Sequence, residues 1–320
     1  MNYIPDYVTF ESMGGTVKKV RRLITPELKT WSAFNPSVGL APDGSMVMAI
    51  RSSNYILNTA TGQYELTCGN SVTNETWLCD LTEELEITNL RKISYGEIEH
   101  QGTKVKLFRG AEDAKLFWRD GWKFTAVLKE PNSGIPIPRV GVFALDNDHA
   151  ELLSVGGFDG ELPEVAEKNW MTTYDENPNF DFVYNESSII KNRERNNLRD
   201  SNDVIKDLRG GSNLWDLGDG TYLALTHKTY VKWIEFYDSK SFGIKKSHIR
   251  DYAHYFARYD CNGILFEMST PFRFVGRGVE FGAGLVVKNG DVIVSFGKDD
   301  ASSYVGKITL KAVLENLKET

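Results

Sequence analysis

From Phe34 onward the chain consists of short segments in which apolar and polar residues alternate, separated by turn signals. Alternation with a period of two is typical of strands with one buried face, and Asp-Gly or Asn-Gly between two such segments indicates a hairpin. Four hairpins are predicted in this way, centred on Asp43-Gly44, Asp120-Gly121, Asp219-Gly220 and Asn289-Gly290. A fifth surrounds the turn at 175–179. The pattern therefore predicts an all-β chain.

Further strand pairs are predicted between these hairpins: 75–79 with 91–94, 141–145 with 152–155, and 254–259 with 264–268. A hairpin with an outer pair makes one blade of a β-propeller, and the units recur at roughly 45–75 residues. We therefore expect one domain over residues 1–320, a five-bladed β-propeller with four-stranded antiparallel blades. Apolar spacing at 310–317 predicts one short C-terminal helix, and the polar segment 192–209 predicts a mobile excursion or short helix over one face.

Composition narrows the class of protein. Of the 320 residues, 41% are hydrophobic and 25% are charged, as in soluble globular chains, and the net charge of −7 disfavours a nucleic-acid partner. Cys68, Cys79 and Cys261 lack metal-ligand spacing and look like reduced thiols. With no apolar segment of membrane-spanning length and no signal peptide, we expect a cytoplasmic protein without a membrane partner, and a homo-oligomer is compatible with this.

Polar residues flank the hairpins where a propeller gathers its inner strands around a central funnel. They include Asn35, Arg51, Glu112, Asp113, Lys168, Trp170, His227, Tyr230, Glu280 and Asp300. Strand alternation predicts that the adjacent acids Glu112 and Asp113 point in opposite directions, one into a pocket and one towards a neighbour. Trp170 and Tyr230 stand beside charged candidates and are suited to stacking on a sugar face.

Each of these residues also has an ordinary structural explanation. Glu112 or Asp113 can be a strand-edge acid that pairs with a nearby cation, and Arg51 a salt-bridge residue at the rim. Lys168 can pair with Glu167 at the surface, and His227 can be a strand histidine satisfied by the backbone. The two aromatic side chains can simply pack in the core. Spacing alone does not decide between these explanations and a functional site.

Motifs in a fixed order add a resemblance to a known family. They are Phe34-Asn35-Pro36-Ser37 with Ile50-Arg51, Gly110-Ala111-Glu112-Asp113-Ala114, Glu167-Lys168-Asn169-Trp170, Leu225-Thr226-His227, and 279–284 with 295–300. Over most of residues 34–308 the chain resembles glycoside hydrolase family 130, the β-mannoside phosphorylases and their relatives, which are five-bladed propellers.

The resemblance implies an enzyme acting on an oligosaccharide or glycoside with β-linked mannose or a similar sugar. It implies that Asp113 is the general acid, acting through a sugar hydroxyl, while inorganic phosphate attacks with inversion. It implies phosphate binding by Lys168 and His227, with Arg51 as a third donor. It also implies that Glu112 either binds the sugar or orients a neighbouring cation. With these we group Asn35, Arg51, Trp170, Tyr230 and Asp300 as substrate-binding candidates.

The chain departs from the family pattern beside the predicted acid. Lys115 stands where the family has Arg, and no motif supplies further phosphate-binding Arg residues, although Lys129 and Arg139 lie in that region. Because a Lys cannot reproduce a bidentate Arg, a glycosyltransferase, a glycosidase or a non-catalytic sugar-binding propeller stays open. His149, His248 and His254 share no metal-ligand spacing, so phosphate as co-substrate is the only small inorganic group expected.

Overall fold

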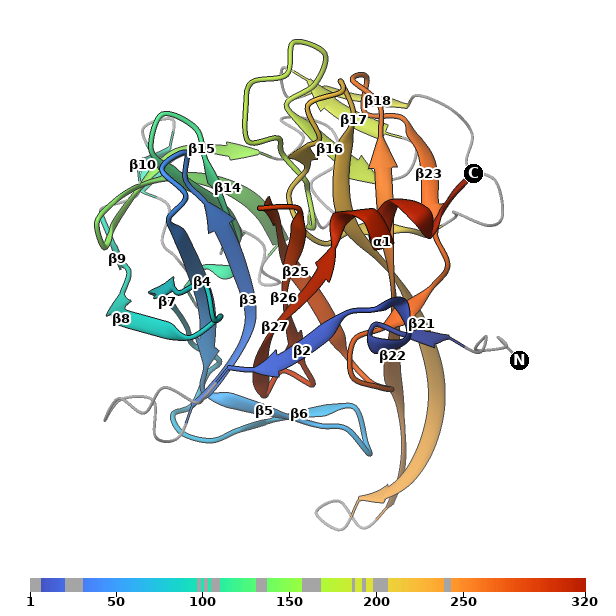
Figure 1. Ribbon diagram of the computed structural model, residues 1–320. Helices are drawn as coiled ribbons and strands as arrows, with labels where there is room; N and C mark the ends of the chain where they lie inside the picture. The colour runs from blue at the N-terminus through green and yellow to red at the C-terminus, as the bar shows by residue number, and fades with distance from the viewer. Residues whose placement is uncertain are drawn as a thin grey trace.

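The computed structural model describes residues 7–20, 31–96, 99–100, 103–104, 110–130, 137–156, 168–185, 188–191, 194–197, 207–238 and 243–320. Within these residues nearly all regular structure is β, as predicted, and the exceptions are α1 (Leu310–Glu315) and the 3-10 helix η1 (Glu11–Met13) (Figure 1). The side chain of Thr309 caps α1 by accepting a hydrogen bond from the backbone N–H of Ala312 at 3.2 Å. The short C-terminal helix is thereby confirmed.

The hairpin at Asp43-Gly44 belongs to a 4-stranded antiparallel sheet in the order β3-β4-β7-β8. Its strands are β3 (Ser32–Leu40), β4 (Met46–Ser53), β7 (Asn74–Leu81) and β8 (Ile87–Lys92). A separate hairpin, β5 (Tyr55–Asn58) with β6 (Gln63–Leu66), leaves the sheet between β4 and β7 and lies below that sheet in Figure 1. This additional hairpin was not predicted.

The hairpin at Asp120-Gly121 opens a 5-stranded sheet in the order β12-β13-β14-β15-β9. Its strands are β12 (Glu112–Trp118), β13 (Trp122–Glu130), β14 (Ile137–Asp146), β15 (His149–Gly156) and β9 (Ser94–Tyr95). β9 pairs with β15 in parallel, so the fifth strand comes from the segment that precedes this unit. A small pair, β10 (Glu99–His100) with β11 (Thr103–Lys104), lies between the two units in sequence.

The hairpin at Asn289-Gly290 lies in a 4-stranded sheet that contains both an early and a late part of the chain. Its strands are β25 (Glu280–Lys288), β26 (Asp291–Lys298), β27 (Ser302–Thr309) and β2 (Thr16–Lys19). β2 pairs with β27 in antiparallel register from Thr16↔Lys307 to Lys19↔Tyr304. The early strand β2 thus completes the last sheet, which ties the two ends of the chain together (Figure 1).

The third and fourth predicted units form one 11-stranded hydrogen-bonded sheet in this structure. Its main path is β1-β24-β22-β21-β19-β16-β17-β18, and β20, β23 and β28 pair beside it. The strands are β1 (Val8–Thr9), β16 (Phe182–Asn185), β17 (Ser188–Lys191), β18 (Glu194–Asn197), β19 (Arg209–Gly210), β20 (Trp215–Asp216), β21 (Tyr222–Asp238), β22 (Gly243–Tyr259), β23 (Leu265–Ser269), β24 (Phe272–Arg273) and β28 (Leu317–Glu319). The two units join where β16 pairs with β19.

Two features of this sheet differ from the expectation. In the polar segment, Glu194–Asn197 is strand β18, paired with β17, while 192–193 and 198–206 lie outside the described residues. β21 and β22 are 17 residues each and stay paired from Tyr222↔Tyr259 to Asp238↔Gly243, so β22 begins well before the predicted strand at 254–259. Their outer halves project away from the sheets as a long arm at the lower right of Figure 1.

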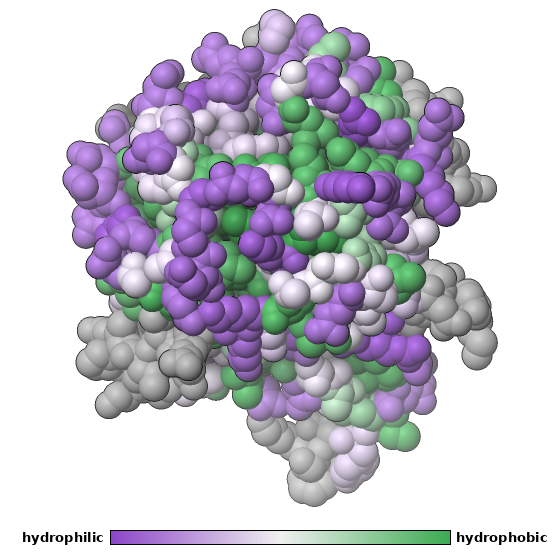
Figure 2. Space-filling model, viewed as in Figure 1, coloured by the Kyte–Doolittle hydropathy of each residue, from purple (hydrophilic) through white to green (hydrophobic). Residues whose placement is uncertain are grey.

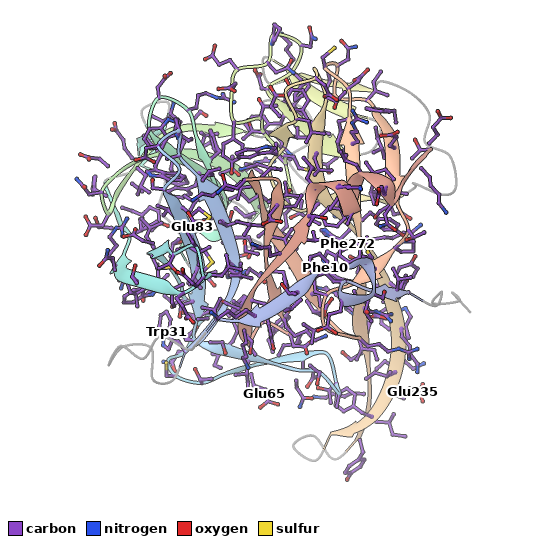
Figure 3. All side chains as sticks on the ribbon, in the orientation of Figure 1. Phe10, Trp31, Glu65, Glu83, Glu235 and Phe272 are labelled. Atoms are coloured by element: carbon purple, nitrogen blue, oxygen red, sulfur yellow. The ribbon has the colours of Figure 1, made fainter. Side chains whose placement is uncertain are left out.

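The sheets pack against each other through aromatic side chains. Phe10, Phe256, Phe272, Phe274 and Phe296 are all buried in one cluster. Phe10 and Phe272 lie side by side with ring centroids 5.8 Å apart (Figure 3), and Phe274 stacks on Phe296 at 4.0 Å. The face in Figure 2 accordingly shows mostly hydrophilic residues, with hydrophobic ones gathered towards its middle. No helix in the described ranges has the length and apolar character that a membrane crossing requires.

Buried serines connect the inner strands of neighbouring sheets. Ser37 in β3 accepts a hydrogen bond from the backbone N–H of Leu116 in β12 at 3.0 Å. Ser295 in β26 accepts one from the N–H of Val38 in β3 at 2.9 Å. These bonds hold β3 beside β12 and β26, and the predicted funnel residues Asn35, Glu112 and Asp300 lie in or next to these three strands.

Candidate active site

A cavity of about 400 Å³ lies beside these strands. The residues that line it come from segments hundreds of positions apart in the sequence, between residues 35 and 300. Seven of the predicted site residues line this cavity: Asn35, Arg51, Glu112, Asp113, Lys168, His227 and Asp300. Tyr55, Tyr64, Asn169, Arg250, Tyr252 and Phe281 also line it and were not predicted as site residues. The fold therefore brings most of the candidate constellation into one place.

The backbone around the cavity departs from regular strand geometry. Asn35, Asp113, Asn169 and Asp300 all have positive φ, at 49°, 55°, 63° and 49°. Asn and Asp tolerate this left-handed region better than other residues with a side chain, because their short polar groups form local hydrogen bonds. The register of β3 with β4 shifts between Phe34 and Ser37, and that of β12 with β13 shifts between Glu112 and Lys115. Such local irregularity is common at functional sites.

The prediction that Glu112 and Asp113 point in opposite directions is wrong. Arg51 Nη1 lies 3.0 Å from Asp113 Oδ1, and Arg51 Nη2 lies 3.7 Å from Glu112 Oε1, so both acids approach one guanidinium. The bulge in β12 is the physical reason, because the positive φ of Asp113 interrupts the two-residue alternation that regular strand geometry would impose.

Arg51 is buried and is held by several partners. Its Nε donates to Asn74 Oδ1 at 2.9 Å, its Nη1 to Asp113 Oδ1 at 3.0 Å, and its Nη2 to the Tyr55 hydroxyl at 3.2 Å. The guanidinium also lies over the ring of Phe34, 5.0 Å from its centroid. These contacts orient Arg51 towards the predicted acid. A direct contact between Arg51 and phosphate or substrate stays a prediction.

Asp113 is held as a carboxylate in the protein alone. Burial acts to raise its pKa, but the Arg51 guanidinium and the hydrogen bonds from Asn35 and Arg51 outweigh burial and hold the pKa below its usual value. The bond from Asn35 Nδ2 to Asp113 Oδ1 measures 2.9 Å. Lys168 contributes further to this lowering through its charge.

Asp300 lines the same cavity, but its pKa is shifted in the opposite direction from that of Asp113. Burial is the main reason that its pKa is raised to about 6, and Asp113 adds to this while Arg51 opposes it. Its Oδ2 accepts a hydrogen bond from the Tyr55 hydroxyl at 3.2 Å. Tyr55 thus connects Asp300 to Arg51 and through it to Asp113. Two carboxyl groups whose pKa values are driven apart by their surroundings can serve in different protonation states.

The cationic and aromatic groups on the cavity wall come from other sheets. His227 is buried, and its ring is stacked on that of Tyr252 at 5.0 Å with an interplanar angle of 5°. Burial, followed by the charges of His254 and Lys115, holds the pKa of His227 well below its ordinary value. Its Nδ1 is buried and has no hydrogen-bond partner among the described residues. A neutral imidazole with one uncommitted nitrogen can bind a ligand as donor or acceptor.

Arg250 is the cation that sequence reasoning missed. It lines the cavity beside Tyr252, two residues further along β22 and on the same face of that strand. The strand was predicted to begin only at 254, because apolar and polar residues do not alternate regularly over 244–253. Of the two cations proposed in place of a missing Arg, Arg139 does not line the cavity, and the side chain of Lys129 lies outside the described part.

Trp170 and Tyr230 lie elsewhere. The ring of Trp170 packs against Phe182 with centroids 5.0 Å apart, and its carbonyl accepts a hydrogen bond from Lys115 Nζ at 3.2 Å. Sugar stacking by Trp170 has no support in this placement. Burial lowers the pKa of Lys115 to about 7. Tyr230 lines a neighbouring cavity of about 570 Å³ that shares Tyr64, Arg250 and Val279 with the first, so its contact with substrate stays a prediction.

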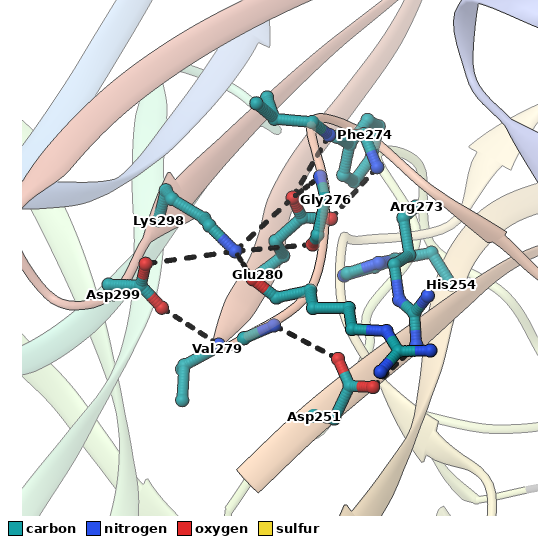
Figure 4. A network of polar contacts seen from close by, with 12 residues as sticks. Asp251, His254, Arg273, Phe274, Gly276, Val279, Glu280, Lys298 and Asp299 are labelled. Carbon is teal, nitrogen blue, oxygen red and sulfur yellow. Dashed lines mark hydrogen bonds and ion pairs between the residues drawn. The ribbon is translucent and has the colours of Figure 1, made fainter. Parts of the chain in front are cut away.

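Glu280 has a structural role beside the cavity. Its carboxylate accepts hydrogen bonds from the backbone N–H groups of Phe274, Val275 and Gly276 at 2.8, 2.9 and 2.9 Å, and it lies 3.7 Å from Lys298 Nζ. Figure 4 shows this network, in which Lys298 and Asp299 extend the contacts to Val279 and the neighbouring loop. An acid with three backbone donors and a cation is satisfied without substrate. In the ranges that the structure describes, no group of three His, Cys, Asp or Glu side chains is arranged to hold a metal ion.

Comparison with known proteins shows similarity at the level of structure. No protein-family model matches the sequence, and no curated protein matches it significantly. A glycoside hydrolase of the GH130 family of mannoside phosphorylases, which targets β-1,2 mannosidic linkages in Candida mannan, superposes with a TM-score of 0.58 at 14% identity, over 97% of each chain. The β-1,2-mannobiose phosphorylase of Listeria innocua gives 0.56 at 12% identity, over 92% of this chain and 94% of its own.

A third structure, the mannose phosphorylase MPT-4 of Leishmania mexicana in complex with a phosphate ion, gives a TM-score of 0.53 at 12% identity. That match covers 99% of this chain and 92% of the Leishmania protein. The chain therefore has a fold like that of the GH130 mannoside phosphorylases and related glycoside hydrolases.

Proposed function

We propose that this chain is a carbohydrate-active enzyme that acts on β-linked mannosides or similar glycosides by inverting phosphorolysis. Asp113 is the general acid and inorganic phosphate the nucleophile. One observation carries the proposal: a single cavity gathers Asp113 with Asn35, Arg51, Lys168 and His227, on a fold like that of mannoside phosphorylases. The serine bonds between inner strands and the pairing of β2 with β27 also favour a ring of five blades, with the 11-stranded sheet supplying two of them.

The surroundings of Asp113 suit proton transfer in a reversible reaction. Cleavage needs a proton delivered to the bridging oxygen, and synthesis needs the same proton removed. The carboxylate held by Arg51 and Asn35 is ready as the base for synthesis. Phosphate and sugar in the cavity add negative charge and exclude water, and both effects raise the pKa of a carboxyl group. The bound state therefore favours the protonated form that cleavage requires.

Lys168, His227 and Arg250 are the groups that would hold phosphate. All three line the cavity, and they come from different segments of the chain. A phosphate dianion needs fixed donors, and charge-assisted hydrogen bonds are the strong ones. The sequence motifs contain no further phosphate-binding Arg, which weakened the case for phosphate. Arg250 supplies such a guanidinium on the cavity wall. Lys115, at the position where the family has Arg, does not line this cavity and donates to the carbonyl of Trp170.

Asn35, Glu112 and Asp300 would bind sugar hydroxyls. Each presents a polar group on the cavity wall, and Asp300 can donate a hydrogen bond in its protonated form and accept one when ionised. Tyr64 and Tyr252 are aromatic wall residues that can lie against a sugar face, a role first assigned to Trp170.

Two related reactions share this machinery. If water replaces phosphate, the enzyme is a glycosidase, and if an acceptor sugar replaces it, the enzyme is a glycosyltransferase. A non-catalytic sugar-binding propeller is the alternative outside catalysis. The carboxylate of Asp113, oriented by Arg51 and Asn35, favours an enzyme, because a sugar-binding module has no need of an acid held in this way.

The test is product analysis with β-1,2-mannobiose and related β-mannosides across a series of phosphate concentrations. We expect a sugar 1-phosphate with inverted anomeric configuration that forms only when phosphate is present. Free sugar formed at a rate independent of phosphate would reject phosphorolysis in favour of hydrolysis. Transfer to an added acceptor without phosphate would identify a transferase. Specific binding of the sugars without any product would identify the non-catalytic module.

A further inference from the structure

The cavity of about 570 Å³ beside the candidate active site is lined by segments from distant parts of the chain. Its walls come from the β5–β6 hairpin, the outer halves of β21 and β22, and residues 277–279. At Gly62, whose φ is +69°, an added Cβ would lie 2.0 Å from the carbonyl oxygen of His248. The turn between β5 and β6 therefore lies directly against β22, and the two hairpins together bound the space.

This cavity continues from the first one. Tyr64, Arg250 and Val279 line both, so a molecule that reaches Asp113 in the first cavity can extend past these residues into the second. Tyr64 and Tyr230 offer aromatic surface in the second cavity, which suits the apolar face of a sugar ring. In a glycoside whose bond lies at Asp113, one saccharide unit would occupy each cavity.

The second cavity has an excess of unpaired positive charge. Lys232, Arg250 and Arg277 are exposed on its walls, and none of them makes an ion pair with another described residue. The two acids that line it are already engaged. Asp251 accepts hydrogen bonds from Arg273 and from the backbone N–H of Gly278, the latter at 3.0 Å.

Asp299, the second acid, is engaged in the same way. It accepts a hydrogen bond from the backbone N–H of Val279 at 3.0 Å and lies 3.7 Å from Lys298 Nζ. The cations are therefore not neutralised by the acids beside them, although the chain as a whole carries a net charge of −7. Such a local concentration of positive charge attracts an anion.

The loop that carries Arg277 is held in position by the buried network of Figure 4. Glu280 binds the backbone N–H groups of residues 274–276, and Lys298 Nζ donates to the carbonyls of Gly276, at 3.2 Å, and of Arg277. The backbone on both sides of Arg277 is thus fixed, and Arg277 lines the cavity with an exposed side chain. Recognition by a group on a fixed backbone loses less conformational entropy on binding.

We infer that the second cavity binds an anionic sugar, so that the saccharide unit beside the reacting one carries a phosphate or a carboxylate group. The inference rests on the proposed function for the bond at Asp113. A neutral sugar is bound by hydroxyl hydrogen bonds and aromatic faces and needs no unpaired cations, whereas guanidinium groups match the oxygens of phosphate and carboxylate. The chemical class of substrate is therefore an acidic glycoside.

The experiment measures binding without turnover, by titration calorimetry of the full chain. The ligands are mannose 6-phosphate, glucuronate, mannose and inorganic phosphate. The variant is Arg277→Gln, because Arg277 lines only the second cavity, with Lys232→Gln as a second variant on another strand. The matched control is Lys311→Gln, a cation on the exposed surface of α1. Circular dichroism and the thermal midpoint verify that each variant is folded.

We expect the wild type to bind mannose 6-phosphate or glucuronate about tenfold or more tightly than mannose, as one charge-assisted contact would supply. Whichever anionic sugar binds better identifies the phosphate or the carboxylate form. Arg277→Gln and Lys232→Gln should each remove much of this preference, while Lys311→Gln retains it. Inorganic phosphate should bind all of these variants equally, because we assign it to Lys168, His227 and Arg250 in the first cavity, and none of these three residues is changed.

Equal affinity of the wild type for the anionic and neutral sugars would overturn the inference. So would unchanged preference in both cavity variants, or a parallel loss of inorganic phosphate binding, which would indicate a simple ion site. These outcomes differ from failure of the proposed function. If no glycoside is cleaved or formed but the preference for anionic sugars still depends on Arg277, the proposed reaction is wrong, while the inference that the second cavity binds an anionic sugar is retained.

Discussion

Replacing Asp113 by Asn tests whether this carboxyl group carries the proton. Asn has the same shape and retains an oxygen that can accept the hydrogen bonds made at 2.9 Å by Asn35 and at 3.0 Å by Arg51. The amide cannot transfer a proton at neutral pH. The change therefore removes the chemistry of the group while leaving the geometry of the cavity nearly intact.

Two magnitudes follow from the contacts. Loss of general acid–base catalysis should lower turnover by about 10²–10⁴-fold. The charge-assisted bond from Arg51 to Asp113 becomes a bond to a neutral amide, and bonds to charged groups contribute roughly 1.5–3 kcal/mol each. Arg51 keeps Glu112 at 3.7 Å and the desolvation of the Asp113 carboxylate is relieved, so we expect the free energy of unfolding to fall by no more than about 1–3 kcal/mol.

The assay is steady-state formation of sugar 1-phosphate from an unactivated β-mannoside, with ligand affinity measured in parallel. Asp219→Asn is the matched control, because Asp219 pairs with Arg258 at 2.6 Å outside the cavity and should keep full turnover. Turnover of Asp113→Asn within a few-fold of wild type would refute the assignment and move the acid role to another group, with Asp300 the next to test. A globally unfolded variant would refute the claim that Arg51 retains enough partners.

Gly110→Ala should destabilise the protein more than Gly218→Ala. The two glycines have similar φ, +76° and +78°, but a Cβ at Gly110 would lie 2.2 Å from the carbonyl oxygen of Asn74, whereas a Cβ at Gly218 would meet open space. Equal denaturant midpoints for the two variants would contradict this prediction. Burial raises the pKa of Asp300 to about 6. The contribution of this group to the free energy of unfolding is therefore fully present below the usual pKa of an aspartate, where Asp300 is protonated, and is lost as the pH rises through 6. The free energy of unfolding of Asp300→Asn should therefore rise relative to that of wild type across this pH window, by up to about 3 kcal/mol. A difference between the two proteins that stays constant from pH 4 to pH 7 would show that the pKa of Asp300 is not raised.

The turn residues and strand periodicity were sufficient to predict the all-β class, the four hairpins at Asp-Gly and Asn-Gly turns, and the short C-terminal helix. These features depend on local backbone preferences, which two residues such as Asp43-Gly44 or Asn289-Gly290 express on their own. Just before the turn at 175–179, the described residues 168–174 have only isolated bridges, at Met171 and Thr173. Residues flanking the hairpins were also predictable as a group. Asn35, Asp113, Lys168 and His227 line one cavity, as the prediction of a shared funnel required.

Tertiary structure decided how these groups face one another. Alternation predicted opposite directions for Glu112 and Asp113, but the bulge that accompanies packing of β12 against its neighbours turns both towards Arg51. Arg250 reaches the cavity only because β22 continues as a long arm, and Trp170 turns inward because Phe182 lies beside it. Local sequence specifies which residues end a strand. Contacts between sheets, made by residues distant in the chain, determine where their side chains point and which charges remain unpaired.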